Sequence, residues 1–307
     1  MKILVTGGAG FIGSHIADNL IEQGHEVVIL DNLSMGRREN INPKAKFYLM
    51  DIGEKEVEKV FQLEKFEAVF HQAAQMDVRK SVENPLFDAE VNVKGSLNLL
   101  QNCVQYKVEK FIFASTGGAV YGEQEEFPCD ESHPLRPVSP YGITKQTVEK
   151  YLFYYAKQFS LPYTILRYAN VYGPRQNPQG EAGVVAIFTH TLLKGKQPLI
   201  NGDGKQTRDY VYVGDVVKAN MKALSYHKND IFNIGTGMET DVNKIFHLLK
   251  EYTNSARPEK HGPAKPGEQQ RSVISYKKAK KLLLWKPEIN LEQGLKKTVD
   301  FFRGKMI

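Results

Sequence analysis

The sequence has few cysteines and no long uninterrupted apolar run. Only two cysteines, Cys103 and Cys129, occur in 307 residues, which predicts a reducing compartment and no disulfide framework. No apolar run reaches the roughly 18 residues that a membrane-spanning helix needs. Gly7 and Gly8 interrupt the apolar residues that begin at Met1, so we expect a buried strand there rather than a secretory signal. These absences predict a cytoplasmic protein that does not enter a membrane.

Metal-ligand clusters and internal repeats are also missing from the sequence. No group of histidines, cysteines and carboxylates has the spacing of a metal site, and we interpret His71 as a packed or backbone-bonded histidine at a strand end. The net charge of +6 is spread along the chain, and its densest cluster, Lys277–Lys281, is typical of the solvated face of a short helix. We therefore expect no metal and no nucleic-acid partner, whereas a mild positive charge suits a phosphate-bearing small substrate.

Strand-like and helix-like stretches alternate through the first half of the chain. Short apolar runs typical of buried strands are separated by stretches in which apolar residues have helical spacing. This alternation predicts an α/β fold in which helices cover both faces of a parallel sheet. The expected strands are 2–6, 26–30, 46–50, 67–71, 110–115, 163–168 and 231–234, and the clearest expected helices are 13–23, 54–63 and 92–106.

The character of the chain changes after Asn170. Glycine and proline become more frequent, and the elements become shorter with longer connections between them. This change predicts a smaller α/β lobe beside the sheet. We expect the large domain to span 1–169, with a return of the chain to it near 229–236, and the smaller lobe to contain most of 170–307.

A glycine motif follows the first expected strand. Gly7 permits a tight turn, Gly10 lets the backbone approach a pyrophosphate, and Gly13 lets the next helix pack close to the strand. Asp31, which lies 18 residues beyond Gly13, ends the second strand. A carboxylate there accepts hydrogen bonds from a ribose diol and repels a 2′-phosphate. The sequence therefore predicts a Rossmann-type, doubly wound sheet that binds NAD rather than NADP.

A second motif, Tyr141 to Lys145, is suited to proton transfer. The two residues are four apart, so a helix places both side chains on one face. A free tyrosine has a pKa of about 10, but a neighbouring ammonium and a positive nicotinamide both favour the phenolate. Thr116 ends the fifth strand at the ligand edge of the predicted sheet, where its hydroxyl can bond a reacting oxygen. Together with the glycine motif, these residues predict oxidation of an alcohol carbon.

The order of these motifs resembles the extended short-chain dehydrogenase/reductase family and, within it, the NAD-dependent epimerases that act on UDP-glucose. The resemblance covers nearly the whole chain. It rests on Thr6–Gly13, Asp31–Ser34, His71–Ala74, Asn92–Gly95, Val120–Gly122, Tyr141–Lys145, Leu166–Arg175 and Arg208–Val211.

The resemblance implies roles for individual residues and pairing of two chains into a homodimer. The implied catalytic residues are Thr116, Tyr141 and Lys145. The implied NAD contacts, which also include Tyr141 and Lys145, are Gly7, Gly10, Phe11, Ile12, Gly13, Asp31, Asn32, Ser34, Gly36, Asp51, Ile52, Gln72, Ala73, Ala74, Asn92 and Tyr168. The implied UDP-sugar contacts are Thr116, Asn170, Val184, Leu199, Asn201, Arg208, Lys265, Glu268 and Ser272.

The resemblance also implies the reaction, which is 4-epimerisation of a UDP-hexose by transient oxidation at C4. Related 4,6-dehydratases carry an acid–base pair directly after the threonine, but here Gly117 and Gly118 follow Thr116. Alternatives are an epimerase of UDP-glucuronate or a UDP-N-acetylhexosamine and, with less support, a non-catalytic NAD sensor. The resemblance also implies that Ser272 falls beside the sugar C2 group, where a small side chain would admit an N-acetyl group.

Overall fold

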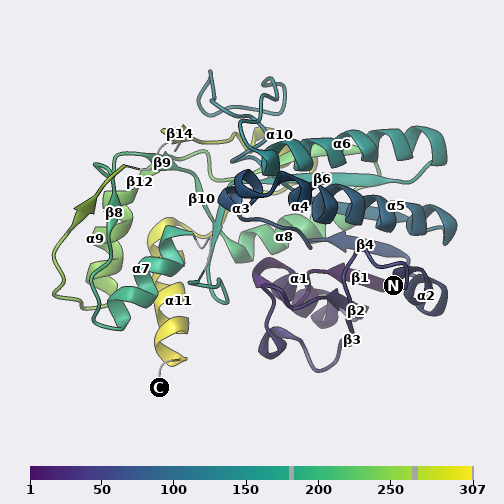
Figure 1. Ribbon diagram of the computed structural model, residues 1–307, viewed down its shortest axis with the longest axis horizontal. Helices are drawn as coiled ribbons and strands as arrows, with labels where there is room; N and C mark the ends of the chain where they lie inside the picture. The colour runs from purple at the N-terminus through teal and green to yellow at the C-terminus, as the bar shows by residue number, and fades with distance from the viewer. Residues whose placement is uncertain (180–182, 265–268, 306–307) are drawn as a thin grey trace.

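A computed structural model describes residues 1–179, 183–264 and 269–305, in which seven parallel strands form the central sheet (Figure 1). The strand order is β11-β6-β5-β4-β1-β2-β3, with adjacent strands parallel. The order reverses between β1 and β4, which opens a crevice at the carboxyl ends of these strands. The predicted doubly wound α/β fold is confirmed. The strands are β1 (Lys2–Thr6), β2 (Glu26–Asp31), β3 (Lys46–Leu49), β4 (Ala68–His71), β5 (Lys110–Thr116), β6 (Tyr163–Tyr168) and β11 (Asp230–Ile234).

Helices cover the two faces of the sheet because successive strand side chains point to opposite sides. Ile3 and Val5 of β1 pack into one apolar core, beside α1 (Phe11–Glu22), α8 (Val213–Leu224) and α10 (Lys277–Leu282). Leu4 packs into the other core, beside α2 (Val57–Glu64), α5 (Gly95–Gln105) and α6 (Pro140–Phe159). In the described part of the chain, no helix is both long and apolar enough to span a membrane.

The expected helix over 92–106 differs most from the structure. The helical path begins earlier, with α3 (Val78–Glu83) and α4 (Pro85–Ala89), passes through one π-helical turn, η2 (Glu90–Lys94), and continues as α5. Asn84 caps α4, because its Oδ1 accepts a hydrogen bond from the Phe87 amide. A π turn shifts the register of the side chains that follow it, and Asn92 within it is buried. A further short turn, η1 (Arg38–Asn40), follows β2, and the helix expected from residue 54 starts at Val57.

The second half of the chain forms a smaller group of helices with its own apolar core. It contains α7 (Val184–Leu193), α9 (Val242–Tyr252) and α11 (Leu291–Gly304), which lie together on the left of Figure 1. Three small sheets lie among the described residues of this half. They are β10 (Tyr210–Tyr212) with β7 (Asn170–Tyr172), β12 (Thr240–Asp241) with β9 (Thr207–Arg208) and β14 (Arg271–Ser272), and β13 (His261–Gly262) with β8 (Ile200–Asn201). The domain boundary after residue 169 stays a prediction.

Candidate active site

The glycine motif forms the turn between β1 and α1. Gly7 has a φ of +68°, and a Cβ at Gly13 would lie 2.2 Å from the Gly7 carbonyl oxygen. Both positions therefore require glycine. A Cβ at Gly10 would meet only that carbonyl, at 3.1 Å, so one side of this residue is open. No side chain caps α1, which begins at Phe11, so the first-turn amides of Phe11 and Ile12 are oriented as anion donors. The turn fits a pyrophosphate.

Asp31 is held at the end of β2 beside this turn. Its Oδ2 accepts a hydrogen bond from the Ala9 amide at 3.0 Å, and its Oδ1 accepts one from the Leu33 amide at 2.8 Å. Burial raises the pKa of Asp31, while these two backbone hydrogen bonds oppose the rise. A Cβ at Gly36 would lie 2.8 Å from Asp31 Oδ1. The carboxylate is thus positioned as an acceptor near the glycine turn, as a ribose diol requires.

The other expected cofactor residues follow neighbouring strands at the same edge. Asp51 follows β3 and accepts a hydrogen bond from Asn32 Nδ2 at 2.7 Å, and Ile52 beside it is buried. Ser34 lies in the loop after β2, where its amide donates to Asn32 Oδ1. Gln72, Ala73 and Ala74 follow β4. Tyr168 ends β6, but its hydroxyl is engaged by Asn220 of α8 at 2.8 Å.

His71 is fully buried and bonds side chains rather than backbone. Its Nδ1 lies 2.8 Å from Thr6 Oγ1, and its Nε2 lies 2.9 Å from Ser96 Oγ. Ser96 Oγ donates its proton to the Asn92 carbonyl, so it can only accept a hydrogen bond from His71. We therefore assign the ring proton of His71 to Nε2. Burial, and then the charge of Lys145, lower the pKa of His71 to about 3. A neutral His71 therefore connects the glycine-turn strand to the start of α5.

Tyr141 and Lys145 lie in the first turns of α6. Ser139 caps this helix through a hydrogen bond from the Gly142 amide, and Pro140 occupies its first turn. Lys145 Nζ donates to the Ala114 carbonyl at 3.0 Å and lies 5.9 Å from the Tyr141 ring centroid. The helix therefore brings the two side chains to the same end of β5, as their spacing predicts.

Burial governs the protonation of this pair in the protein alone. Burial, followed by the charge of Asp88, raises the pKa of Tyr141 above its usual range. Burial lowers the pKa of Lys145 to about 8, and Asp88 and Glu149 oppose that change. The expected lowering of the Tyr141 pKa by Lys145 is thus not seen in the protein by itself.

Thr116 ends β5 directly beside Tyr168, its register partner on β6. The glycines that follow it leave different amounts of space. A Cβ at Gly117 would lie 2.6 Å from Ile274 Cδ1, whereas one at Gly118 would meet nothing closer than Asn170 Oδ1 at 3.5 Å. A side chain at position 117 would therefore require Ile274 to shift. A Cβ at Gly118 would lie 3.8 Å from Thr116 Oγ1.

The expected substrate residues are distributed over the small sheets and α7. Arg208 of β9 pairs with Thr240 of β12 on one side and with Ser272 of β14 on the other, and its Nη1 donates to the Thr207 carbonyl. Val184 opens α7, Leu199 is about half exposed at 46%, and Asn201 lies in β8. Asn170 of β7 donates its amide to the Asp209 carbonyl. Lys265 and Glu268 lie outside the described residues.

Several residues that shape the site were not predicted from the sequence. Asp209 is buried, and its carboxylate accepts hydrogen bonds from Thr236, Gly237 and Ile274, which fixes the strand that carries Arg208. A buried ion pair at 2.6 Å joins Arg167 of β6 to Glu149 of α6. A signal for this pair existed, because Arg167 interrupts an apolar strand and therefore needs a buried partner.

Known proteins are similar to this chain over nearly its whole length. The model of the NAD dependent epimerase/dehydratase family matches residues 3–235. A UDP-glucose 4-epimerase of Mycolicibacterium smegmatis is 42% identical, over 99% of both chains. The crystal structure of UDP-glucose 4-epimerase from Thermotoga maritima with UDP-glucose has a TM-score of 0.99 and 52% identity over 100% of both chains. The Thermus thermophilus UDP-glucose 4-epimerase complex with NAD has a TM-score of 0.94 and 46% identity over 99% of both chains.

Proposed function

Because the chain belongs to the NAD dependent epimerase/dehydratase family, we propose that it is an isomerase that interconverts UDP-glucose and UDP-galactose by NAD-dependent epimerisation at C4. The observation that carries the proposal is the position of Tyr141, Lys145 and Thr116. All three lie at the carboxyl ends of the strands, at the edge where the glycine turn and Asp31 fit NAD.

Tyr141, Thr116 and Arg208 have different roles in the proposed reaction. We assign Tyr141 as the group that removes the proton of the sugar 4-hydroxyl and later returns it, because its side chain lies at this edge beside Lys145. The Thr116 hydroxyl bonds the same sugar oxygen. Arg208 holds the diphosphate through its forked guanidinium while the 4-keto sugar turns over. When bound, NAD supplies the acceptor, and then the donor, of the hydride at C4.

Incubation of the purified protein with UDP-galactose, without added NAD, tests the proposal. Chromatography should show UDP-glucose rising to a constant ratio with UDP-galactose, because the cofactor is regenerated in every turnover. If no UDP-glucose forms even after NAD is added, the assigned reaction is wrong.

The two glycines after Thr116 disfavour a 4,6-dehydratase, although a human dTDP-D-glucose 4,6-dehydratase is 35% identical over 98% of this chain. Elimination needs an acid and a base beyond the tyrosine. Positions 117 and 118 are glycines and supply no carboxylate, and a side chain at position 117 would require Ile274 to shift. A non-catalytic NAD sensor is disfavoured as well, since Tyr141 and Lys145 are both in place.

The small side chain of Ser272 favours a second substrate class, the UDP-N-acetylhexosamines. Ser272 is the register partner of Arg208, and a UDP-N-acetylglucosamine 4-epimerase from Methanobrevibacter ruminantium is similar, with a TM-score of 0.94 and 35% identity. Ser272→Tyr should abolish turnover of UDP-N-acetylglucosamine and spare that of UDP-glucose, whereas Ser272→Ala should retain both. Equal loss of both substrates in the tyrosine variant would contradict this specificity role.

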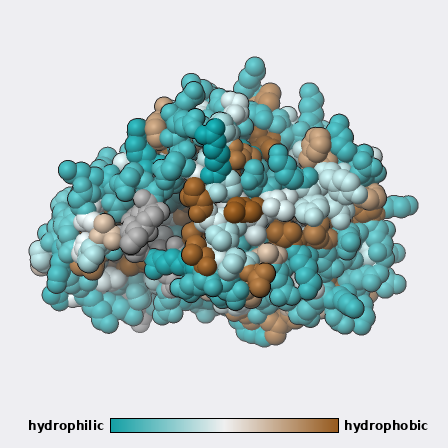
Figure 2. All heavy atoms as spheres, turned by 45° about the horizontal axis from the view of Figure 1, so that its top comes forward, coloured by the Kyte–Doolittle hydropathy of each residue, from teal (hydrophilic) through white to brown (hydrophobic). Residues whose placement is uncertain are grey.

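We further propose that the protein is a cytoplasmic homodimer that pairs through α6. Ile143, Tyr151 and Tyr154 are exposed and recur on one face of this helix, and Leu86 of the adjoining α4 is 83% exposed. Figure 2, in which the top of Figure 1 comes forward, shows apolar side chains among polar ones on this side of the molecule. Both cysteines are free, which fits a reducing compartment.

Light scattering tests the dimer. Its expected mass is twice 34.8 kDa, and Tyr154→Glu should halve the observed mass, because the charge would be buried in the interface. Exposed Phe153 is a matched position on another side of the helix, and Phe153→Glu should leave the mass unchanged. A monomeric wild type would refute this part of the proposal.

A further inference from the structure

Asp88 is a fully buried carboxylate beside the candidate active site. It lies in α4, and none of the motifs that predicted the site contains it. Its Oδ2 accepts a hydrogen bond from Thr144 Oγ1 at 2.7 Å. Its Oδ1 accepts hydrogen bonds from Gln75 Nε2 at 2.9 Å and from Asn92 Nδ2 at 3.1 Å. All three donors are electrically neutral, so they solvate the carboxylate without cancelling its charge.

The three donors belong to three different parts of the site. Thr144 precedes Lys145 on α6, Gln75 lies in the loop that follows β4, and Asn92 lies in the π turn. Asn92 also joins the backbone of Gln75 in both directions, since its Oδ1 accepts from the Gln75 amide at 2.8 Å and its Nδ2 donates to the Gln75 carbonyl at 2.9 Å. One carboxylate therefore connects the proton-transfer helix to the loop that carries expected cofactor contacts.

We propose that Asp88 is a positioning residue for hydride transfer, which holds α6 against the loop after β4 and whose negative charge offsets the positive charge that gathers beside Tyr141. The inference rests on the proposed function for the roles of Tyr141 and Lys145. It adds a residue that sets their geometry and their charge without touching the sugar.

Among the charges near Tyr141 and Lys145, Asp88 is a buried carboxylate whose hydrogen-bond donors are neutral. Glu149 of α6 is another buried carboxylate near Lys145, but it forms an ion pair with Arg167 at 2.6 Å. Burial, followed by the charge of Asp88, raises the pKa of Tyr141. Burial lowers the pKa of Lys145, and the charges of Asp88 and Glu149 oppose that change. Other charged side chains on the described elements that pack around this part of α6 are Asp77, Arg79, Lys80 and Glu83 at α3, Glu90 and Lys94 of η2, and Arg167 of β6. His71 of β4 lies near enough for the charge of Lys145, after burial, to lower its pKa.

Asp88→Asn separates the charge from the geometry. The amide oxygen would still accept from Gln75 and Asn92. The new NH2 group would donate to Thr144 Oγ1, whose own proton can pass to the Tyr141 carbonyl, already 3.0 Å away. The network thus survives while one negative charge disappears. Glu90→Gln removes a charge from the exposed surface two residues further along and serves as the matched control.

The decisive readout is the ionisation of Tyr141 in the NAD-loaded protein. The phenolate absorbance of a variant that carries Tyr141→Phe, subtracted from that of its tyrosine parent, isolates this one group. In Asp88→Asn the midpoint should move to lower pH, and on the acidic limb kcat/KM should rise by about threefold, equivalent to about half a pH unit. Glu90→Gln should not move the midpoint. An unchanged midpoint in Asp88→Asn would overturn the electrostatic role.

Two further results keep the proposal testable. The titration needs no sugar, so a protein that fails to turn over UDP-galactose would refute the proposed function and leave the test of Asp88 intact. If Asp88→Asn does not fold, Thr144→Ala keeps the charge and removes the hydrogen bond that joins the carboxylate to α6. That variant should lower kcat several-fold with an unchanged Tyr141 midpoint, and an unchanged kcat would overturn the positioning role.

Discussion

The two edges of the central sheet use polar residues in opposite ways. At the amino-terminal edge, Glu64 of α2 accepts hydrogen bonds from Lys2, Lys46 and Tyr48, so the chain satisfies its own charges. Lys110 at the start of β5 is buried there as well and donates to the Tyr226 carbonyl at 2.6 Å. These contacts join elements that are distant in sequence, and their consequence is stability.

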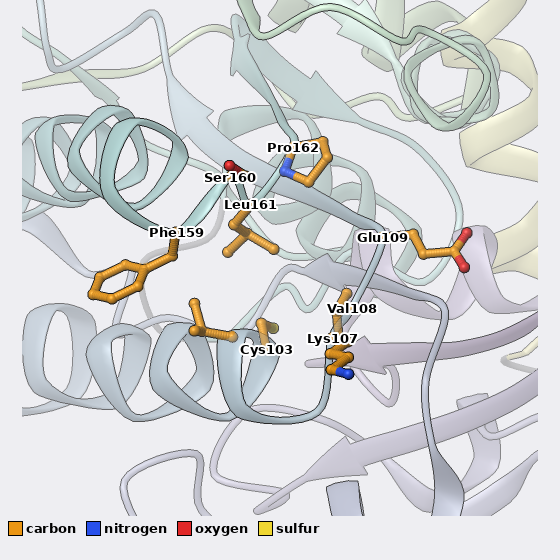
Figure 3. Close-up of a pocket in the computed structure, with 9 residues that line it drawn as sticks. Cys103, Lys107, Val108, Glu109, Phe159, Ser160, Leu161 and Pro162 are labelled. Carbon is orange, nitrogen blue, oxygen red and sulfur yellow. The ribbon is translucent and has the colours of Figure 1, made fainter.

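The carboxyl-terminal edge instead presents groups that fit ligands. Open amides at the start of α1, the Asp31 carboxylate and the hydroxyls of Thr116 and Tyr141 all gather there. A pocket lies at the opposite edge, where α5 and α6 end and β5 and β6 begin (Figure 3). None of the expected site residues lines it. Substitutions at the carboxyl-terminal edge should therefore affect catalysis, and substitutions at the amino-terminal edge should affect stability.

Replacement of Tyr141 should give the largest effect. Tyr141→Phe removes the proton-transfer group and should lower kcat by about 10²–10⁴-fold, while the melting temperature stays close to that of the wild type. Steady-state kinetics and thermal unfolding on the same preparation measure both. Tyr154→Phe changes an exposed tyrosine of the same helix and should retain activity. A clearly lower melting temperature of Tyr141→Phe would contradict the prediction that this edge serves catalysis rather than stability.

Arg208 tests the substrate side of the carboxyl edge. Arg208→Lys keeps the charge but loses the forked donor, which should raise KM by about 10–100-fold and leave kcat nearly unchanged, because the clamp acts before and during the reaction alike. Lys205→Met, which removes an exposed cation nearby, should leave KM unchanged. A fall in kcat with KM unchanged would show that Arg208 acts on the transition state instead.

Glu64 tests the amino-terminal edge and should give the smallest effect. Burial alone would raise the pKa of Glu64, but hydrogen bonds from Lys46, Tyr48 and Lys2 lower it to about 2 from an ordinary 4.5. Its contribution to stability is therefore present above pH 4.5 and is lost as the pH falls toward about 2.

Glu64→Gln should accordingly lower the free energy of unfolding near pH 7 by up to about 3 kcal/mol, with the difference from wild type shrinking in acid. Denaturant unfolding at several pH values measures this, and kcat should not change. Glu26→Gln, at an exposed carboxylate that pairs with Lys2, should have little effect. Loss of activity in Glu64→Gln would contradict the division between the edges.

The cofactor side could be predicted from the sequence because its signals are local. The glycine motif, Asp31 and the residues after β4 each follow an apolar run, and the observed strands end within one residue of the expected ends, as with β2, which extends to Asp31. The substrate side depends on pairings between distant segments. β9 lies between β12 and β14, which brings Arg208, Thr240 and Ser272 together, and no periodicity encodes such short strands.

The buried polar residues could be predicted least well. Asp88 and Asp209 look like ordinary turn or surface carboxylates in the sequence, because their burial depends on donors supplied by other elements. The π turn at Glu90–Lys94 was likewise invisible, since the apolar spacing around it is compatible with one continuous helix. Tertiary contacts decide these features, and the expected roles of the individual site residues stay predictions until they are measured.

The measurement that tests the central claim most directly follows the hydrogen at C4. UDP-galactose deuterated at C4 is incubated with the purified protein, and the UDP-glucose formed is analysed by mass spectrometry and NMR. If the carboxyl edge carries out transient oxidation at C4 with a retained cofactor, the product keeps the deuterium at C4. Replacement of the label by solvent hydrogen would contradict the account.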